Sequence, residues 1–218
     1  MERLTHDVFL LKTPRYAINT YLVGDVLIDA GTQFDGKRIL RELSGSAVAA
    51  HALTHGHPDH YGSSHQVCEA LSIPLWCPAG DVEAVESGNQ VIARSRIAPL
   101  LERLPTPPSH PVSHRLVEGD EVAGFRVMDA PGHSPGQVAY WRESDRTLIL
   151  GDVLTGMHLL TTKPGLHEPP AILTPDPARN RESARRLAPL EPALVCFGHG
   201  PPLRDTRAFV DFVATLAA

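Results

Sequence analysis

Four side chains that can bind a metal ion fall within one short stretch of the chain. Thr54-His55-Gly56-His57-Pro58-Asp59-His60 supplies His55, His57, Asp59 and His60. The stretch follows an apolar run, residues 48–53, that predicts a buried β-strand. Gly56 and Pro58 disfavour a helix here, so we expect a tight loop that turns the imidazoles towards one cavity. The alternative, a polar turn with incidental histidines, accounts poorly for so many ligands at a strand end.

Three further candidate ligands occur later, each just after a predicted strand and next to a glycine. They are His133 after residues 122–129, Asp152 after residues 147–150 and His199 after residues 195–197. Singly, each fits ordinary turn chemistry. Because loops at strand ends commonly present sites on one rim, we expect all three to join the first cluster. Imidazole and carboxylate ligands suit Zn²⁺, and also iron or manganese.

One motif imitates a different class of enzyme. Gly132-His133-Ser134-Pro135-Gly136 matches the G-x-S-x-G elbow of serine hydrolases. That elbow uses the backbone N–H after the serine, and Pro135 has none. Residues 137–142 also predict a strand where the elbow needs a helix. We therefore reject Ser134 as a nucleophile.

Short strands and helices alternate through two similar halves. Branched and aromatic runs predict strands at residues 8–11, 19–23, 26–28, 48–53, 75–77, 122–129, 138–141, 147–150 and 195–197. Helical patterns cover residues 36–43, 65–72, 81–88, 94–104, 176–187 and a last stretch around 209–216. The mixture predicts an α/β (α+β) fold in which helices cover the sheets.

Two stretches interrupt this pattern. Residues 81–113 are predicted as a helical insertion between the halves, and residues 154–177 as a long proline-rich loop. Long loops of this kind are often functional lids. No linker separates the halves, so we expect one domain over residues 1–218.

The combined set of residues resembles the metallo-β-lactamase-fold hydrolases. The resemblance rests on Asp29 in Leu27-Ile28-Asp29-Ala30-Gly31, the His55-x-His57-x-Asp59-His60 loop, His133, Asp152 and His199. It implies a four-layer αβ/βα sandwich with two related halves. It also implies two metal ions: one is held by His55, His57 and His133, the other by Asp59, His60 and His199. Asp152 would bridge the ions and Asp29 would orient the ligand loop.

The resemblance implies a hydrolase that attacks its substrate with a hydroxide bridging the two ions. Metal-bound water can have its pKa lowered to about 7, so no separate strong base is needed. Asp59 is the expected catalytic carboxylate, which orients the hydroxide and passes a proton to the leaving group. Asp152 stands where the true β-lactamases have cysteine. This is similar to the glyoxalase-II-like branch and implies a small thioester, ester or lactone substrate; we expect zinc, with iron or manganese as alternatives.

The chain departs from particular members of that branch. Only one predicted helix follows His199, so we do not expect the glutathione-binding helical domain of glyoxalase II. Thr155 stands where the acyl-homoserine lactonases carry tyrosine. The large nucleic-acid-binding domain of the nuclease branch is also not expected.

The sequence does not identify the residues that bind substrate. We expect residues 154–177 and the region around Phe34 to cover the substrate pocket. Within that loop, His158, Lys163 and His167 can touch substrate, although a solvated loop explains each equally well.

Two other functions remain open. A mononuclear-iron persulfide dioxygenase of the same fold shares the histidine motif but uses one iron ion, so metal analysis separates it from the hydrolase. A non-catalytic metal-binding module would normally hold one closed, four-coordinate ion, which fits the full ligand set less well.

The composition limits the partners. The 218 residues carry a formal net charge of −5 and no Lys/Arg run, which disfavours nucleic-acid binding. No apolar run reaches the length of a membrane span, and the N-terminus lacks a secretory signal pattern. Cys68, Cys77 and Cys196 form no C-x-x-C motif and fit free thiols in a reducing compartment. We therefore expect a cytoplasmic enzyme for a small molecule, in which residues 81–104 form a lid or a homodimer contact.

Overall fold

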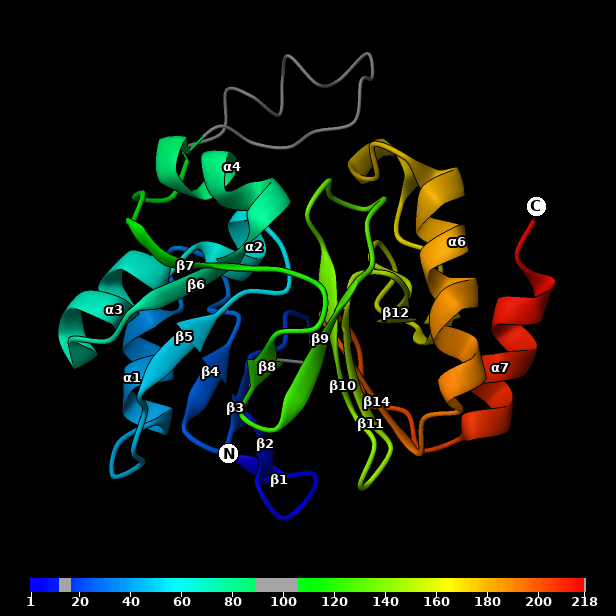
Figure 1. Cartoon of the computed structure of the whole chain (residues 1–218), viewed down its shortest axis with the longest axis horizontal. Coiled ribbons are helices and arrows are strands. Elements are labelled where there is room, and N and C mark those ends of the chain that lie inside the picture. Colours follow the sequence, from blue (N-terminus) through cyan, green and yellow to red (C-terminus); the bar gives the residue numbers. More distant parts are fainter. Residues whose placement is uncertain (12–16, 89–105, 218) are drawn as a thin grey trace.

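Two β-sheets lie face to face at the centre of the molecule, and helices cover the outer face of each (Figure 1). The computed structural model describes residues 1–11, 17–88 and 106–217. Its layers run helix, sheet, sheet, helix. This arrangement confirms the predicted four-layer αβ/βα sandwich.

The first half of the chain forms a seven-stranded sheet whose strands lie in sequence order. They are β1 (Glu2–Arg3), β2 (Val8–Leu10), β3 (Tyr21–Val23), β4 (Val26–Ile28), β5 (Ala50–Ala52), β6 (Leu75–Pro78) and β7 (Val112–Leu116). Strands β1 to β4 pair antiparallel, and β4 to β7 pair parallel. Its outer face carries α1 (Gly36–Glu42), α3 (Ser64–Leu71) and α4 (Val82–Ser87). The parallel strands place their carboxyl ends, and the loops that follow them, at one edge.

The second half forms a five-stranded sheet in the order β14-β11-β10-β9-β8. These strands are β8 (Glu121–Val122), β9 (Phe125–Asp129), β10 (Val138–Arg142), β11 (Thr147–Gly151) and β14 (Leu194–Phe197). Helices α6 (Pro177–Leu187) and α7 (Thr206–Thr215) pack on its outer face. Asp176 and Asp205 start these helices by accepting hydrogen bonds from Arg179 N and Ala208 N.

Successive side chains of a strand point to opposite faces of its sheet, and so enter different hydrophobic cores: the one between the sheets or the one under the helices. Tyr21 and Val23 of β3 point into the core between the sheets, whereas Leu22 packs under the helices of the first half. In β10, Tyr140 likewise enters the central core and Trp141 faces the second helical layer. Because side chains alternate every two residues, one short strand supplies apolar side chains to the cores on both faces of its sheet.

The structure corrects three details of the sequence prediction. The end of the predicted helical insertion is strand β7, which extends the first sheet beside β6. Residues 154–177 are not irregular throughout, because β12 (Thr155–Met157) and β13 (Pro164–His167) pair as a two-stranded sheet. A one-turn helix, α2 (Pro58–Tyr61), stands inside the predicted ligand loop. The helix predicted at 94–104 lies outside the described residues.

Short 3-10 turns complete the described chain. They cover Ala79–Asp81, Ala171–Leu173 and Ala188–Leu190. Over the described ranges, no helix combines the length and the apolar character needed to cross a bilayer.

Candidate metal centre

The seven candidate ligands come together in one cluster, each following a strand of the two sheets. Strand β5 precedes the histidine-rich stretch, β9 precedes His133, β11 precedes Asp152 and β14 precedes His199. We name His55, His57 and His133 the imidazole triad, and Asp59, His60 and His199 the mixed triad. Within each triad the ligand atoms lie within 4.8 Å of one another, and the same holds for His55, His60 and Asp152. Asp152 thus stands between the triads.

The histidine-rich stretch combines an extended segment with a helical turn. His57 is the N-cap of α2 and has extended backbone angles (φ −88°, ψ 147°). Pro58 occupies the first helical position, where its missing N–H costs nothing. The prediction that Pro58 prevents a helix is therefore wrong for the residues after it. The helical turn groups Asp59 and His60 with His199, while the His60 ring still lies beside that of His55, with centroids 4.1 Å apart.

The imidazole triad is buried and its rings lie edge to face. The His55 and His57 ring centroids are 4.7 Å apart, and those of His57 and His133 are 4.5 Å apart. The ring nitrogens His55 Nε2 and His57 Nδ1 lie 3.2 Å apart. Three imidazole nitrogens that face one another in this way present lone pairs to a common point.

Asp152 reaches histidines of both triads with one carboxylate oxygen. Its Oδ2 lies 3.1 Å from His199 Nε2, 3.6 Å from His60 Nε2 and 3.5 Å from His133 Nε2. A Cβ at Gly198 would overlap the other oxygen, Asp152 Oδ1, so the close approach of these loops requires glycine. Asp152 therefore faces both triads with one oxygen.

Asp59 is the most accessible member of the cluster. Its side chain is 40% exposed, whereas those of His60 and His199 are 0% and 6% exposed. Asp59 Oδ2 lies 3.3 Å from His199 Nε2 and 3.9 Å from His60 Nε2. One carboxylate thus faces both the buried ligands and the outside.

Two buried polar atoms in the cluster fit the presence of a cation. His60 Nε2 and Asp152 Oδ1 are buried and have no hydrogen-bond partner within the described chain. Buried polar atoms normally find partners, because an unpaired one costs about 1–3 kcal/mol. Both atoms belong to residues that the resemblance assigns as ligands. The donor set therefore fits the metal ions that the fold family implies.

The two triads differ in charge. Burial and the neighbouring imidazoles lower the pKa of His133 to about 3, and lower the pKa values of His55 and His57 in the same way. In the mixed triad burial also opposes the charge on His199, but Asp152 and Asp59 outweigh it and raise its pKa to about 10. The imidazole triad is therefore neutral at pH 7, whereas the mixed triad is an ion-paired network.

Asp29 orients both ends of the histidine-rich stretch. It adopts a left-handed backbone (φ 58°), which Asp tolerates better than most residues. Its carboxylate accepts hydrogen bonds from Thr54 N (2.8 Å) and Thr54 Oγ1 (2.7 Å), and lies 2.9 Å from His60 Nδ1. The contact with Nδ1 leaves His60 Nε2 free to face the cluster.

Asp81 joins the ligand loops of the two halves, and the sequence analysis missed it. Its buried carboxylate accepts hydrogen bonds from Gly56 N (2.8 Å), Ser134 Oγ (2.5 Å) and Gly136 N (2.7 Å). Gly56 belongs to the first ligand loop and Ser134 follows His133, so Ser134 serves as a donor here. The available signal was its position just after strand β6, which matches that of the ligands.

Further contacts fix the ligands of the second half. Thr174 Oγ1 lies 3.1 Å from His133 Nδ1. His199 Nδ1 contacts the carbonyl oxygen of Ala17. Asn19 Nδ2 donates to Phe197 O (2.9 Å), in the strand before His199. Residues 17–21 of the first half therefore hold the last ligand loop.

The remaining candidates lie around the cluster or away from it. His158 and His167 face each other at the β12–β13 hairpin, with ring centroids 5.3 Å apart. Lys163 is exposed, and Phe34 is 85% exposed. The three cysteines are free and buried, as predicted (Cys68, Cys77 and Cys196). Burial raises the pKa of the Cys68 thiol to about 12, which makes it unreactive at neutral pH.

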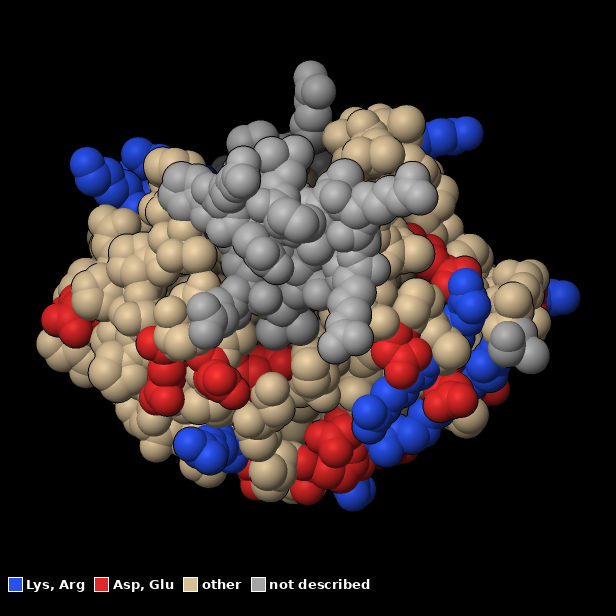
Figure 2. Space-filling view, turned by 90° about the horizontal axis from the view of Figure 1, so that it is seen from above, with Lys and Arg blue, Asp and Glu red and all other residues tan. Residues whose placement is uncertain are grey.

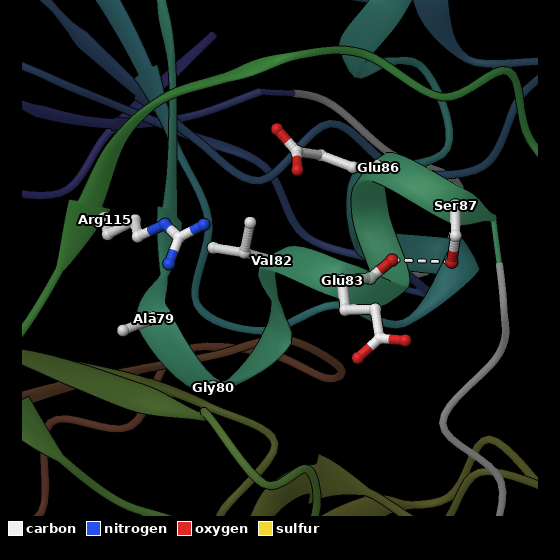
Figure 3. A pocket seen from close by; sticks show the side chains of 7 residues that line it. All are labelled: Ala79, Gly80, Val82, Glu83, Glu86, Ser87 and Arg115. Atoms are coloured by element: carbon white, nitrogen blue, oxygen red, sulfur yellow. Dashed lines mark hydrogen bonds between the residues drawn. The ribbon is translucent and has the colours of Figure 1, made fainter.

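A separate open pocket lies at the start of α4 (Figure 3). Its volume is about 540 Å³, and it is lined by Ala79 and Gly80 together with Glu83, Glu86 and Arg115. None of its lining residues belongs to either triad. The pocket is therefore separate from the metal centre.

Comparison with known proteins gives one family. The model of the metallo-beta-lactamase superfamily matches residues 13–199. A probable metallo-hydrolase, YflN of Bacillus subtilis (strain 168), is 30% identical over 206 residues, covering 82% of this chain and 76% of that protein. A hydroxyacylglutathione hydrolase of Bdellovibrio bacteriovorus is 29% identical over 114 residues, 50% of this chain and 36% of its own length.

A solved structure agrees with this result. The crystal structure of TTHA1623 in a di-iron-bound form is 30% identical, superposes with a TM-score of 0.68, and covers 94% of this chain and 97% of that one. The matched range, residues 13–199, spans both triads and Asp152. The chain therefore belongs to the metallo-β-lactamase superfamily.

Proposed function

We propose that this protein is a metal-dependent hydrolase with a two-ion centre. The observation that carries the proposal is the completeness of both triads around one shared carboxylate, Asp152. A structural metal site would normally close around one ion with four ligands. Three ligands on each side of a bridging carboxylate instead leave coordination positions open for water and substrate.

The triads would hold one ion each, with Asp152 between them. When bound, the ions would polarise a substrate carbonyl and lower the pKa of a water molecule. Asp59 is the residue placed to handle protons, because its carboxylate is partly exposed and lies 3.3 Å from His199 Nε2. The neighbouring His60 and His199 hold the pKa of Asp59 below its usual range, so it is anionic and can orient a nucleophile.

We propose a small thioester, ester or lactone as the substrate. The likeness to a hydroxyacylglutathione hydrolase and the carboxylate at the bridging position support this class. Thr174 lies in the 154–177 segment with its hydroxyl 3.1 Å from His133 Nδ1, which supports that segment as part of the substrate pocket. On the face seen in Figure 2, Lys and Arg side chains are interspersed with Asp and Glu, which favours a small molecule over a nucleic acid.

The identity of the ions is a separate part of the proposal. Imidazole and carboxylate ligands suit zinc, iron and manganese alike. Ligand type does not choose among these ions; we propose zinc, and the di-iron form of TTHA1623 makes iron the principal alternative.

The test is a substrate panel with metal-loaded protein. We expect turnover of thioesters, esters or lactones and none of phosphodiesters. Loss of that turnover on chelation, and recovery on adding back Zn²⁺ or Fe²⁺, would support the proposal. No hydrolysis by fully loaded protein, together with oxygen consumption on a persulfide, would replace the hydrolase by the dioxygenase.

A further inference from the structure

A second group of metal-binding side chains lies outside the metal centre. His65 and Glu69 stand four residues apart on α3, and His110 lies just before strand β7. Their ligand atoms lie within 4.8 Å of one another. We propose that these three residues form a second, independent binding site for Zn²⁺ or a similar divalent transition-metal ion.

The distances suit a tetrahedral ion. His65 Nδ1 and His110 Nδ1 lie 3.3 Å apart. Two nitrogens bound to one tetrahedral zinc ion at 2.0–2.1 Å are separated by about 3.3–3.4 Å. Glu69 Oε1 lies 3.9 Å from His110 Nδ1, and this side chain is 65% exposed, so a small rotation completes a His₂Glu set. Water would fill the fourth position.

The two histidines are already held in place. Ser64, the residue before His65, has its buried hydroxyl 2.8 Å from His51 Nε2, which anchors the start of α3 in the core. The side chain of His110 is only 13% exposed. Pro111 follows it and restricts its backbone to an extended conformation. The ion would therefore meet two pre-oriented nitrogens, which limits the entropy lost on binding.

The chemistry of the two rings suits a transition-metal cation. Two Nδ1 atoms that face each other can share one proton in a hydrogen bond, and when both rings carry their proton on Nε2 the two Nδ1 lone pairs can instead bind one cation. Burial and His65 lower the pKa of His110, so its ring is ready to accept a metal. Nitrogen ligands exclude Mg²⁺ and Ca²⁺, which prefer oxygen. A bound ion would tie α3 to the segment that enters β7.

The test counts metal ions in the full-length protein. Parent protein and the variants H65A, H110A and H114A are dialysed against the same buffered free Zn²⁺ that saturates the metal centre, and zinc per chain is measured by mass spectrometry. We expect H65A and H110A each to bind one ion fewer than the parent. His114 is an exposed histidine of β7 outside the group, so H114A should match the parent.

A thermal measurement separates a lost site from a damaged fold. Raising Zn²⁺ beyond saturation of the metal centre should raise the melting temperatures of the parent and H114A by more than those of H65A and H110A, because the two site variants have lost one binding site for the ion. Circular dichroism checks that the variants are folded. Equal zinc counts in all four proteins, or loss of an ion in only one of the two site variants, would overturn the proposal. Neither result bears on catalysis by the metal centre.

Discussion

The imidazole triad and the mixed triad share a cluster but differ in electrostatics. His55, His57 and His133 surround one another, so burial and mutual repulsion keep them neutral. His60 and His199 face carboxylates, which keep them protonated in the absence of metal. A cation can enter the first triad without displacing a proton, whereas entry into the second must release protons. The two triads would therefore bind their ions with different pH dependence, although each has three candidate ligands.

Removing the carboxylate that faces both triads should have the largest effect. D152A takes away the carboxylate that faces His60, His133 and His199. We expect activity to fall by about a thousandfold or more, since the loss corresponds to several kcal/mol of transition-state stabilisation. Hydrolysis kinetics and metal content are the measurements. A folded D152A that retains parental activity would rule out the bridging role.

The pH dependence of metal binding should distinguish the triads. The His199 pKa of about 10 means that it is protonated throughout pH 6–8, so its proton must leave when metal binds. Affinity of the mixed triad should then rise at least about a hundredfold from pH 6 to pH 8, tenfold per unit for each proton released. His133, with a pKa of about 3, is already neutral, so affinity of the imidazole triad should stay nearly constant.

The measurement uses variants that keep one triad intact. H57A retains the mixed triad and H199A retains the imidazole triad. Chelator competition at pH 6, 7 and 8 gives the affinity of each. Parallel pH profiles for the two variants would show that the electrostatic difference does not control binding.

Asp81 should affect both triads together, because its partners belong to the ligand loops of both halves. D81A leaves three donors (Gly56 N, Ser134 Oγ and Gly136 N) without their buried acceptor. We expect the free energy of unfolding to fall by about 3 kcal/mol and activity to fall about 10–100-fold. Urea unfolding and kinetics test this against D25N, which changes an exposed aspartate in a turn. A D81A variant as stable as D25N would contradict the linking role.

The smallest predicted effect is confined to one triad. T174V removes the hydroxyl that lies 3.1 Å from His133 Nδ1 and keeps a similar shape. Losing such an orienting contact typically costs 10–100-fold, and we expect the lower end, about tenfold, in metal affinity of the imidazole triad. Chelator competition in the H199A background measures it. Equal weakening of the mixed triad, measured in the H57A background, would show that Thr174 acts on the whole cluster.

The layers and the clustering of the candidate ligands were predictable because their signals are local. Apolar runs such as residues 147–150 predicted strands, and each ligand directly follows such a run. Strand β7 was missed because His114 and Arg115 are exposed there and give no apolar pattern. The β12–β13 pair was missed because proline and glycine hide its extended character.

The supporting contacts were not predictable, because they join residues far apart in sequence. Asp81 meets Gly56 and Ser134 across 25 and 53 residues, and Thr174 meets His133 across 41. A lone aspartate or threonine in the sequence carries no sign of such partners. Only the packing of the two sheets brings these loops together.

Anomalous scattering from crystals of protein purified without chelator or added metal tests the central claim most directly. Data collected at the zinc and iron edges identify each ion and its position. We predict two peaks, one within His55, His57 and His133 and the other within Asp59, His60 and His199. A single peak confined to one triad in fully active protein would contradict a two-ion hydrolase.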